Sequence, residues 1–592
     1  MESVLMCGIL AILDNFGAPA RAARHGRRGD YLLDRLQHRG PDGRGTLASS
    51  RGWLGHRRLS IVDLAGGAQP FVADGLAWVS NAEIFNHHEL RDRFGATASR
   101  SDCSVIGRTW RALGDNAPAA LDGQFAWVCI EEATGRWIAT RDHAGISPLY
   151  VGWHQDGTIW FASEMKALVD DCAKVEVLPP GHAWCSDERG MRLAKWYTPV
   201  WEYETPNAPV DLPRLRSVLI EGVRKRMMSD VPWGVLLSGG VDSSIVAAIA
   251  TRLCREQGVE PPRSFAIGLE GGPDLAAARR VAEFLGTRHH EFTFTIAEAM
   301  DTIPAAVGHL ESYQQVRTAV PTMILARRVR EAGVKMVLSG EGADELLGGY
   351  LYFHSAPSAE AFHAETVRKT MRLHLYDVMR ANKAPMAHGV ELRFPFLDRD
   401  FIDAAMGIDP AERMVRSDRP GRRGIEKEIL RRAFDDPADP WLPADVLWRQ
   451  KEQFSDGVGY RWVDAVRAAA ALQTSSRELA EAAATYPEDP PVNAEMLWMR
   501  RLFDAAFVTG RVSGRSALAT VGVGRSIACS TPEAVAWNPE WEALAGDISG
   551  RAIAGVHQAR CALEAPATCD VLRRQFDDFG GRGAVVDAQQ AD

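Results

Sequence analysis

The sequence predicts an α/β multidomain protein, with an α+β N-terminal part and a C-terminal doubly wound parallel α/β domain that carries added helices. The chain has 592 residues, too many for one hydrophobic core, because a domain usually has about 100–200 residues. Short apolar runs separated by turn residues fill the first 200 positions, as is typical of strands. A proline-rich stretch over residues 201–213 follows. Beyond it, strand and helix patterns alternate, so we expect a domain boundary near residue 205.

The expected elements follow from these patterns in chain order. In the N-terminal part, apolar runs predict strands over residues 7–13, 53–62, 76–79, 125–130, 137–141 and 160–162. Helical spacing begins at Leu215. Strands are then predicted over residues 233–237, 264–269, 290–294 and 334–338, and helices over residues 243–255, 274–285 and 321–332. Residues 355–510 are expected to be helical, and the polar end of the chain is expected to be frayed.

Composition restricts the class of ligand. There are 68 Lys and Arg residues against 77 Asp and Glu, for a net charge of -9, so the chain lacks the cationic excess of a general nucleic-acid binder. No run of about 18 apolar residues and no signal-peptide pattern is present, which predicts a cytoplasmic protein without membrane contact. Nine cysteines without a CxxC pair are expected to be reduced thiols, of which one is a candidate nucleophile. We therefore expect small-molecule ligands.

A glycine- and serine-rich turn follows the strand predicted to end at Leu237. It reads Ser238-Gly239-Gly240-Val241-Asp242-Ser243-Ser244. Glycines let backbone N–H groups approach a phosphate, the following helix N-terminus attracts an anion, and Asp242 can hold Mg2+. No Walker A lysine follows. The spacing resembles the pyrophosphate loop of ATP pyrophosphatases, which adenylate a carboxylate or an amide and release pyrophosphate.

A second glycine-rich turn follows the strand predicted to end at Leu338. It contains Ser339, Gly340, Glu341 and Asp344. Carboxylates beside a triphosphate need a cation, so we expect Asp344 to join Asp242 on Mg2+. Glu341 is then available to accept a proton from an attacking amine.

These turns and the run Trp448-Arg449-Gln450-Lys451-Glu452-Gln453-Phe454-Ser455-Asp456-Gly457 together resemble the glutamine-dependent asparagine synthetases. The resemblance covers about residues 6–560, with further matches at residues 265–269, 349–354, 381–384 and 389–398. It implies a glutaminase domain over residues 7–205, a synthetase domain over residues 206–560 and a flexible extension over residues 561–592. The implied reaction converts aspartate to asparagine through β-aspartyl-AMP. Ammonia from glutamine hydrolysis would arrive through an interdomain tunnel, and AMP, pyrophosphate and glutamate would be released.

For the synthetase half, the resemblance implies roles residue by residue. Glu341 would assist formation or aminolysis of the acyl-adenylate. Lys451 would stabilise negative charge on the α-phosphate and pyrophosphate as it develops. Mg2+ would lie on Asp242 and Asp344. The residues that would bind ATP are Leu237, Ser238, Gly239, Gly240, Asp242, Ser243, Ile267, Ser339 and Gly340.

The N-terminal half resembles the class II glutamine amidotransferases, which implies an Ntn-hydrolase-like sandwich. In that family the cysteine matched by Cys7 is the first residue, and its α-amino group is the base for the thiol. Arg58 would pair with the glutamine carboxylate, and Glu83 and Asp102 would hold the amino end. Asn81 and the Ala82 N–H would form the oxyanion hole. The full set implied to bind glutamine is Arg58, Leu59, Ser60, Ile61, Val62, Asn81, Ala82, Glu83 and Asp102.

The sequence departs from the glutaminase pattern at three places. Five residues precede Met6, so either translation starts at Met6, which we favour, or a leader is removed, or the glutaminase is inactive. Ala82 replaces a glycine, which is tolerable at a negative φ. Arg100 also stands where a glycine is usual, and its side chain would either enter the amino-group pocket or point to solvent.

The acceptor acid stays open at this point. Only three residues separate Tyr313 from Arg317, whereas asparagine synthetases usually carry a longer, threonine-rich segment there. One alternative is a relative from specialised metabolism that amidates another acid or closes an intramolecular amide such as a β-lactam. Such ring-forming relatives typically lose the cysteine and carry tyrosine in place of Glu341, and this chain keeps both Cys7 and Glu341. The other alternative is a catalytically silent paralogue. A homodimer is compatible with all of these functions.

Overall fold

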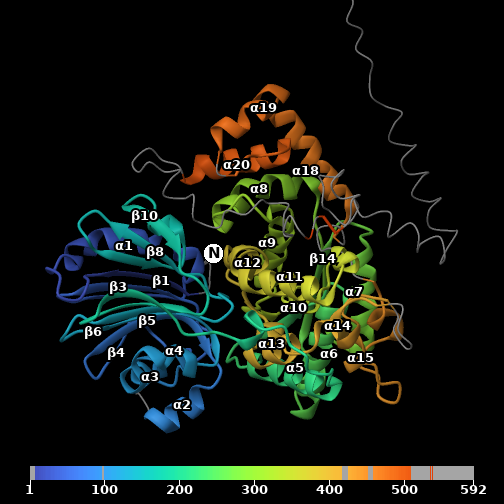
Figure 1. Cartoon of the computed structure of the whole chain (residues 1–592), viewed down its shortest axis with the longest axis horizontal. Helices are drawn as coiled ribbons and strands as arrows, with labels where there is room; N and C mark the ends of the chain where they lie inside the picture. The colour runs from blue at the N-terminus through green and yellow to red at the C-terminus, as the bar shows by residue number, and fades with distance from the viewer. Residues whose placement is uncertain are drawn as a thin grey trace, which may run out of the picture.

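The computed structural model describes residues 7–95, 99–416, 424–450, 458–487 and 489–507, together with residues 534, 536 and 537. Two antiparallel sheets form the N-terminal part, and a parallel sheet surrounded by helices forms the C-terminal part (Figure 1). This arrangement confirms the predicted α/β multidomain class. The predicted extension over residues 561–592 lies outside the described residues.

The N-terminal part is a sandwich of two six-stranded sheets. In spatial order, the first sheet contains β10 (Cys172–Val177), β8 (Tyr150–His154), β9 (Ile159–Ala162), β1 (Gly8–Leu13), β3 (Gly52–Arg58) and β2 (Gly43–Ala48). The second contains β12 (Gly190–Lys195), β11 (His182–Asp187), β7 (Trp137–Arg141), β6 (Gly123–Glu131), β5 (Leu76–Ile84) and β4 (Phe71–Ala73). The helical segments here are η1 (Ala22–His25), α1 (Gly26–Asp34), η2 (Gln37–Arg39), α2 (His87–Phe94), η3 (Asp102–Val105), α3 (Ile106–Leu113), η4 (Gly114–Asn116), α4 (Ala117–Ala120), η5 (Met165–Ala167) and η6 (Val200–Glu202).

Strand β1 is apolar throughout because both of its faces are buried. Alternate residues of a strand point to opposite faces of its sheet. Ile9 and Ala11 belong to the core between the two sheets. Leu10 and Ile12 belong instead to a cluster that continues into the parallel sheet of the second part, where it includes Val235. One hydrophobic cluster therefore continues from the N-terminal sandwich into the C-terminal part.

The C-terminal sheet has five parallel strands. Their spatial order is β15 (Arg288–Thr293), β14 (Arg263–Gly268), β13 (Trp233–Leu236), β16 (Met336–Leu338) and β17 (Glu391–Arg393). The chain runs outward from β13 to β15 and then returns to β16 beside β13. Ligands of open α/β sheets bind where the strand order reverses in this way, at the carboxyl ends of the two central strands. Both glycine-rich turns follow these two strands.

Helices surround this sheet and continue beyond it. They are α5 (Leu212–Arg226), α6 (Val241–Glu256), α7 (Pro273–Leu285), α8 (Ile296–Leu310), α9 (Val316–Glu331), α10 (Ala343–Leu347), η7 (Leu351–Ser355), α11 (Ala359–Arg372), η8 (Leu373–Leu375), α12 (Asp377–Met386), η9 (Pro395–Leu397), α13 (Arg399–Met406), α14 (Pro410–Arg413), α15 (Glu428–Ala433), α16 (Ala444–Leu447), α18 (Tyr460–Gln473), α19 (Ser476–Thr485) and α20 (Ala494–Phe507). The last three lie together at the top of Figure 1.

Three predicted boundaries are wrong by four residues or more. The strand predicted over residues 76–79 continues to Ile84. The strand predicted over residues 53–62 ends at Arg58, and the four residues after it form a loop. The helix predicted to begin at Pro321 begins at Val316. Proline inside a helix leaves the carbonyl four residues earlier without its usual donor. Here that carbonyl belongs to Arg317, and the indole Nε1 of Trp462 donates to it at 2.8 Å, so the helix continues through the proline.

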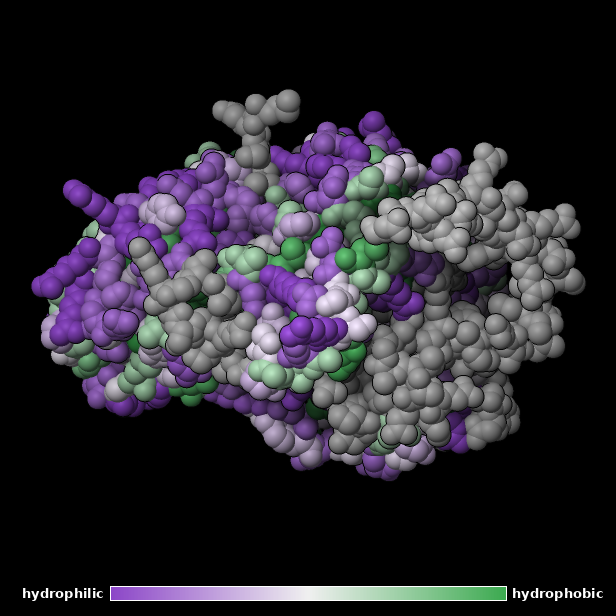
Figure 2. Space-filling view, turned by 90° about the horizontal axis from the view of Figure 1, so that it is seen from above, coloured by the Kyte–Doolittle hydropathy of each residue, from purple (hydrophilic) through white to green (hydrophobic). Residues whose placement is uncertain are grey.

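The described surface is polar over most of the face that Figure 2 shows, where hydrophobic residues appear in small groups among hydrophilic ones. Isolated apolar residues on a surface are normal for a folded protein. Among the described residues, we find no helix with the length and hydropathy needed to cross a bilayer.

Candidate active sites

Cys7, the predicted nucleophile, directly precedes β1 and is half-buried. Its Sγ lies 3.8 Å from the carbonyl oxygen of Leu59. Arg39 donates from Nε to the Cys7 carbonyl oxygen at 3.2 Å and from Nη2 to Oδ1 of Asn382 in α12 at 3.1 Å. Burial raises the pKa of the Cys7 thiol to about 12. A thiol in this setting needs a base at short range before it can act as a nucleophile.

Arg58 ends β3 and folds back over the loop that follows. Its Nη2 donates to the Asp63 carbonyl oxygen at 2.6 Å, and its Nη1 donates to the Leu64 carbonyl oxygen at 3.1 Å. Asp63 has a positive φ of 51°, which closes the loop around the guanidinium. Leu59 and Ile61 are buried. The side chain predicted to hold the glutamine carboxylate is thus positioned by its own loop.

The same loop is tied to the C-terminal part. Ser60 donates its N–H to Asp42 Oδ2 at 2.8 Å, and Nζ of Lys335, just before β16, lies 2.9 Å from the same oxygen. The Asp230 N–H, which precedes β13, donates to the Ile61 carbonyl oxygen at 3.0 Å. Residues next to both central strands of the parallel sheet therefore contact the predicted glutamine-binding loop.

Asn81, Ala82 and Glu83 lie on β5. Ala82 is not among the described non-glycine residues with positive φ, so its methyl group is compatible with the backbone. An ion pair of 2.7 Å joins Glu83 Oε2 to Nη2 of Arg393 on β17, and Arg393 Nε donates to Glu391 Oε1 at 2.6 Å. Burial raises the pKa of both glutamates. Glu83, which is predicted to bind the amino group of glutamine, thus also forms an ion pair with Arg393 of the C-terminal part.

Asp102 lies at the start of η3, and its Oδ2 accepts the N–H of Ile84 at 2.8 Å. Burial raises the pKa of this carboxyl group. Arg100 is exposed, and its backbone N–H donates to Asp63 Oδ2 at 2.9 Å. Of the two positions considered for Arg100, the structure has the solvent-exposed one, and Arg100 does not fill the space beside Asp102.

The first glycine-rich turn connects β13 to α6. Gly239 has φ +75°, and a Cβ there would lie 2.5 Å from the Ala277 Cβ, so only glycine fits. Ser243 Oγ lies 3.0 Å from Ser238 Oγ and accepts the Ser238 N–H at 3.2 Å. Gly240 precedes the first turn of the sixteen-residue helix α6. The turn thus places glycine backbone, hydroxyl groups and a helix N-terminus together, as anion binding requires.

The second glycine-rich turn connects β16 to α10 and packs against the first. A Cβ on Gly340 would lie 2.7 Å from the backbone nitrogen of Ser243. Ser339 is buried and donates its N–H to the Arg393 carbonyl oxygen at 2.9 Å. Leu237 and Ile267 are also buried, next to the carboxyl ends of β13 and β14. The structure therefore brings the residues predicted to bind ATP to one edge of the sheet.

Asp242 and Asp344, the predicted Mg2+ ligands, both contact Lys427, which no sequence motif indicates. Lys427 Nζ lies 2.5 Å from Asp242 Oδ2 and 2.8 Å from Asp344 Oδ1. Its side chain is buried and its φ is +54°. The two carboxylates come from different turns and share one cation. No spacing in the sequence marks Lys427, because it lies 185 positions from Asp242.

Glu341 forms a 2.6 Å ion pair with Nη2 of Arg380 in α12. Arg380 is buried, whereas the Glu341 side chain is 28% exposed. The predicted proton acceptor is therefore held by a fixed cation and still open to solvent. Arg449 donates to the Gly239 carbonyl oxygen at 3.3 Å, so the run that begins at residue 448 reaches the first turn. Lys451 lies outside the described residues.

The segment after α8, which the sequence analysis linked to the acceptor, begins with a buried carboxylate. Glu311 accepts the N–H groups of Met165 and Lys166, both at 2.8 Å, and pairs with Lys383 Nζ at 2.6 Å. Lys383 also donates to the Tyr150 hydroxyl at 2.6 Å. Hydrogen bonds from this buried ion pair to residues of the N-terminal part therefore join the two parts here.

Two family models match the chain, and together they cover most of it. The model described as asparagine synthase matches residues 214–495, and the model described as glutamine amidotransferase domain matches residues 6–196. A glutamine-hydrolysing asparagine synthetase of Asparagus officinalis is 46% identical over 94% of this chain and 94% of its own length. An Arabidopsis thaliana relative of the same name, numbered 2, is 46% identical over 94% of this chain and 96% of its own length. This chain belongs to the family of glutamine-hydrolysing asparagine synthetases.

Proposed function

We propose that the chain catalyses ATP-dependent synthesis of asparagine from aspartate through β-aspartyl-AMP. Ammonia from glutamine hydrolysis would be the nitrogen source, and AMP, pyrophosphate and glutamate would be the other products. The observation that carries the proposal is that one chain keeps both Cys7 before β1 and Glu341 in the second glycine-rich turn. The family match favours this reaction over a ring-forming relative and over a silent paralogue.

In the proposed glutaminase reaction, Cys7 is the first residue of the mature chain. The raised pKa keeps the buried thiol protonated, so a base is needed, and the adjacent α-amino group would take the proton as the thiol attacks. The thiolate attacks the amide carbon of glutamine, and the Asn81 side chain and the Ala82 N–H stabilise the oxyanion. The C–N bond then breaks, ammonia leaves with a proton, and water cleaves the thioester to glutamate.

Binding of glutamine in this site would use the charged groups around Cys7. Arg58 would exchange one of its loop carbonyls for the glutamine carboxylate. Glu83 and Asp102 would hold the amino group, with Leu59, Ser60, Ile61 and Val62 forming the wall. Because Glu83 also pairs with Arg393, an amino group there would meet a carboxylate already fixed by the synthetase half.

In the proposed synthetase reaction, a carboxylate oxygen of aspartate attacks the α-phosphorus of ATP and pyrophosphate leaves. Asp242 and Asp344 would hold Mg2+, which would neutralise phosphate charge when bound. Their shared contact with the Lys427 ammonium supports their fitness for a cation. Ammonia then attacks the acyl carbon, Glu341 accepts the excess proton, and AMP leaves. Lys451 would stabilise the charge on the α-phosphate and pyrophosphate.

The proposed domains are a glutaminase domain over residues 7–205 and a synthetase domain over residues 206–560. A shared hydrophobic cluster and buried contacts hold the two proposed domains against each other, and passage of ammonia between their sites is part of the proposal. A cytoplasmic location and a homodimer remain predictions, which cell fractionation and sedimentation can test.

The substitution Cys7→Ala tests the glutaminase half. We expect glutamine-dependent synthesis to fall by at least about 1000-fold, because removal of a catalytic nucleophile eliminates covalent catalysis. Synthesis from free ammonia should stay within about twofold of the wild-type rate, because the acyl-adenylate forms at the other site. Asparagine formation measured with each nitrogen source gives both numbers.

The matched control is Cys254→Ala, which removes a buried thiol of α6. It should use both nitrogen sources at the wild-type ratio. Loss of both activities in Cys7→Ala, with Cys254→Ala active, would mean that Cys7 is structural and would refute its role as nucleophile.

A further inference from the structure

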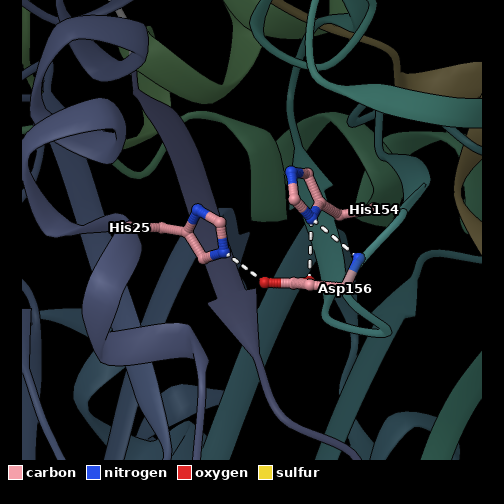
Figure 3. A group of neighbouring side chains, drawn as sticks. All are labelled: His25, His154 and Asp156. Atoms are coloured by element: carbon pink, nitrogen blue, oxygen red, sulfur yellow. Dashed lines mark hydrogen bonds and ion pairs between the residues drawn. The ribbon is translucent and has the colours of Figure 1, made fainter.

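A cluster of two imidazoles and a carboxylate lies on the N-terminal sandwich, apart from the residues assigned to either reaction. His25 is the last residue of η1, His154 is the last residue of β8, and Asp156 lies in the turn to β9. Figure 3 shows His25 Nε2 and His154 Nδ1 both directed at the Asp156 carboxylate. The three residues therefore converge on one point from two separate segments.

The donor atoms are close together and reachable from solvent. His25 Nε2 lies 2.7 Å from Asp156 Oδ2, and His154 Nδ1 lies 2.8 Å from Asp156 Oδ1. One ligand atom from each residue lies within 4.8 Å of the other two. The side chains are 17%, 22% and 30% exposed. A tetrahedral zinc ion needs donor atoms about 3.3 Å apart, so small movements of exposed side chains would suffice.

Both imidazoles face the Asp156 carboxylate, one at each oxygen. His154 Nδ1 lies 2.8 Å from Asp156 Oδ1 and 3.2 Å from the Asp156 backbone nitrogen. In the tautomer that carries its proton on Nε2, this Nδ1 offers its lone pair toward the carboxylate. A metal ion between the nitrogen and the carboxylate would then be bound by both.

The surroundings orient the cluster for binding. Thr158 donates its backbone N–H and its hydroxyl to Asp156 Oδ1 at 3.0 and 2.7 Å. Trp160 stacks on the His154 ring, with ring centroids 5.3 Å apart, and meets the His25 ring edge-on at 5.1 Å. The carboxylate and the two imidazoles are thus held in place by their neighbours.

We propose that His25, His154 and Asp156 bind a divalent transition-metal ion, with Zn2+ as the best match. Two imidazole nitrogens and one carboxylate oxygen form a donor set that suits Zn2+. Mg2+ and Ca2+ favour sites in which all ligand atoms are oxygen. Three protein ligands leave one position for water. The ion would join the segment before α1 to the β8–β9 turn, so its effect would be on the stability of the sandwich.

Equilibrium dialysis of the full chain against Zn2+, with metal analysis, tests the site. Wild-type protein should bind one more Zn2+ per chain than His25→Gln, which keeps a side chain able to bond to Asp156. Asp156→Asn, which keeps acceptors for Thr158, should show the same loss. We expect affinity to fall at least about 10-fold in each variant, because even an outer-shell change costs that much. Zn2+ should raise the thermal midpoint of the wild type but not of either variant.

The matched control is His88→Ala, which removes an exposed imidazole of the same sandwich. It should bind Zn2+ like the wild type, and a lost equivalent in this control would place the site elsewhere. The proposal is wrong if the wild type binds no Zn2+, or if His25→Gln and Asp156→Asn bind as many ions as the wild type with the same affinity. If one variant does not fold, the other decides.

Discussion

Lys427 places a buried ammonium between carboxylates from two different turns. Asp242 and Asp344 carry two negative charges against the one positive charge of Lys427. A group of like charges in a partly dry site is costly without a counter-ion. The lysine lowers this cost and holds the two carboxylates close together.

The substitution Asp344→Asn keeps the shape of this group and removes one charge. We expect ammonia-dependent asparagine synthesis to fall about 100-fold or more, since a lost electrostatic contact at a reacting centre costs about 3–4 kcal/mol. Glutaminase activity should stay within about twofold of wild type. Separate assays of glutamate and asparagine formation measure the two effects.

Asp435→Asn is the control, because Asp435 is an exposed residue of the same domain. It should leave both activities unchanged. Equal loss of glutaminase and synthetase activity in Asp344→Asn would contradict a local role for this carboxylate.

Side chains on the turns could be predicted from the sequence, whereas their partners could not. A glycine-rich run between a strand and a helix is a local signal, so Ser238, Asp242 and Glu341 were found directly. Arg380 and Lys427 lie on other elements, 39 and 185 positions away from their partners. Only the fold brings such charges together, and no periodicity marks them.

The two glycine-rich turns act as one element because their backbones touch. Gly340 lies where a Cβ would be 2.7 Å from the Ser243 nitrogen and 3.0 Å from the Asp242 Cβ. Ser243 is in the first turn of α6, so any added atom on Gly340 must push the second glycine-rich turn away from the first. Contact between backbone atoms leaves no flexible side chain to move aside.

The substitution Gly340→Ala therefore should separate the turns. We expect synthesis from ammonia to fall at least about 100-fold, because misplacement of a reacting group by about 1 Å has that effect. Glutamine hydrolysis should persist, since its residues lie on the sandwich. Kinetics of both half-reactions measure the difference.

Gly308→Ala is the matched control, since Gly308 lies in α8 and a Cβ there meets nothing within 4 Å. This substitution should keep full activity and raise stability by up to about 1 kcal/mol, because alanine favours a helix over glycine. A fully active Gly340→Ala enzyme would refute the tight contact between the turns.

Helices and strands could be predicted from the sequence where a local pattern of apolar and turn residues determines them. Strand β1 and helix α6 follow from apolar runs and turn residues. The strand end predicted at residue 62 was wrong because Leu59 and Ile61, although apolar and buried, lie in a loop after the strand. The helix start predicted at Pro321 was wrong because Trp462, far along the chain, donates to the Arg317 carbonyl that the proline leaves without a partner in the helix. Tertiary contacts decided both cases.

Buried charged groups join the two halves of the molecule. Glu83 of β5 pairs with Arg393 of β17. Glu311 pairs with Lys383 of its own half and accepts backbone N–H groups of Met165 and Lys166 from the other half. Lys335 contacts the loop after β3 through Asp42. Charged residues usually lie at the surface, so sequence patterns gave no reason to pair positions 83 and 393. In this structure the same contacts align the proposed ammonia source with the proposed acceptor site.

The substitution Arg393→Met tests this junction. It would leave Glu83 and Glu391 buried without their cation, and removal of one partner of a buried pair costs about 3–5 kcal/mol. We expect the free energy of unfolding to fall by about that amount in urea titrations followed by tryptophan fluorescence. Glutamine hydrolysis should also become less tightly coupled to asparagine formation.

Arg477→Met provides the comparison, because Arg477 is 86% exposed and its ion pair with Glu481 lies at the surface. Loss of such a pair should cost less than about 0.5 kcal/mol. Similar effects of the two substitutions would show that the buried network does not join the halves.

The most direct test of the account is the product balance of the purified protein with aspartate, MgATP and glutamine. The account predicts asparagine, AMP and pyrophosphate in equal amounts, with glutamate formed at least in step with asparagine. Pyrophosphate release with another carboxylic acid, and none with aspartate, would contradict the proposed function.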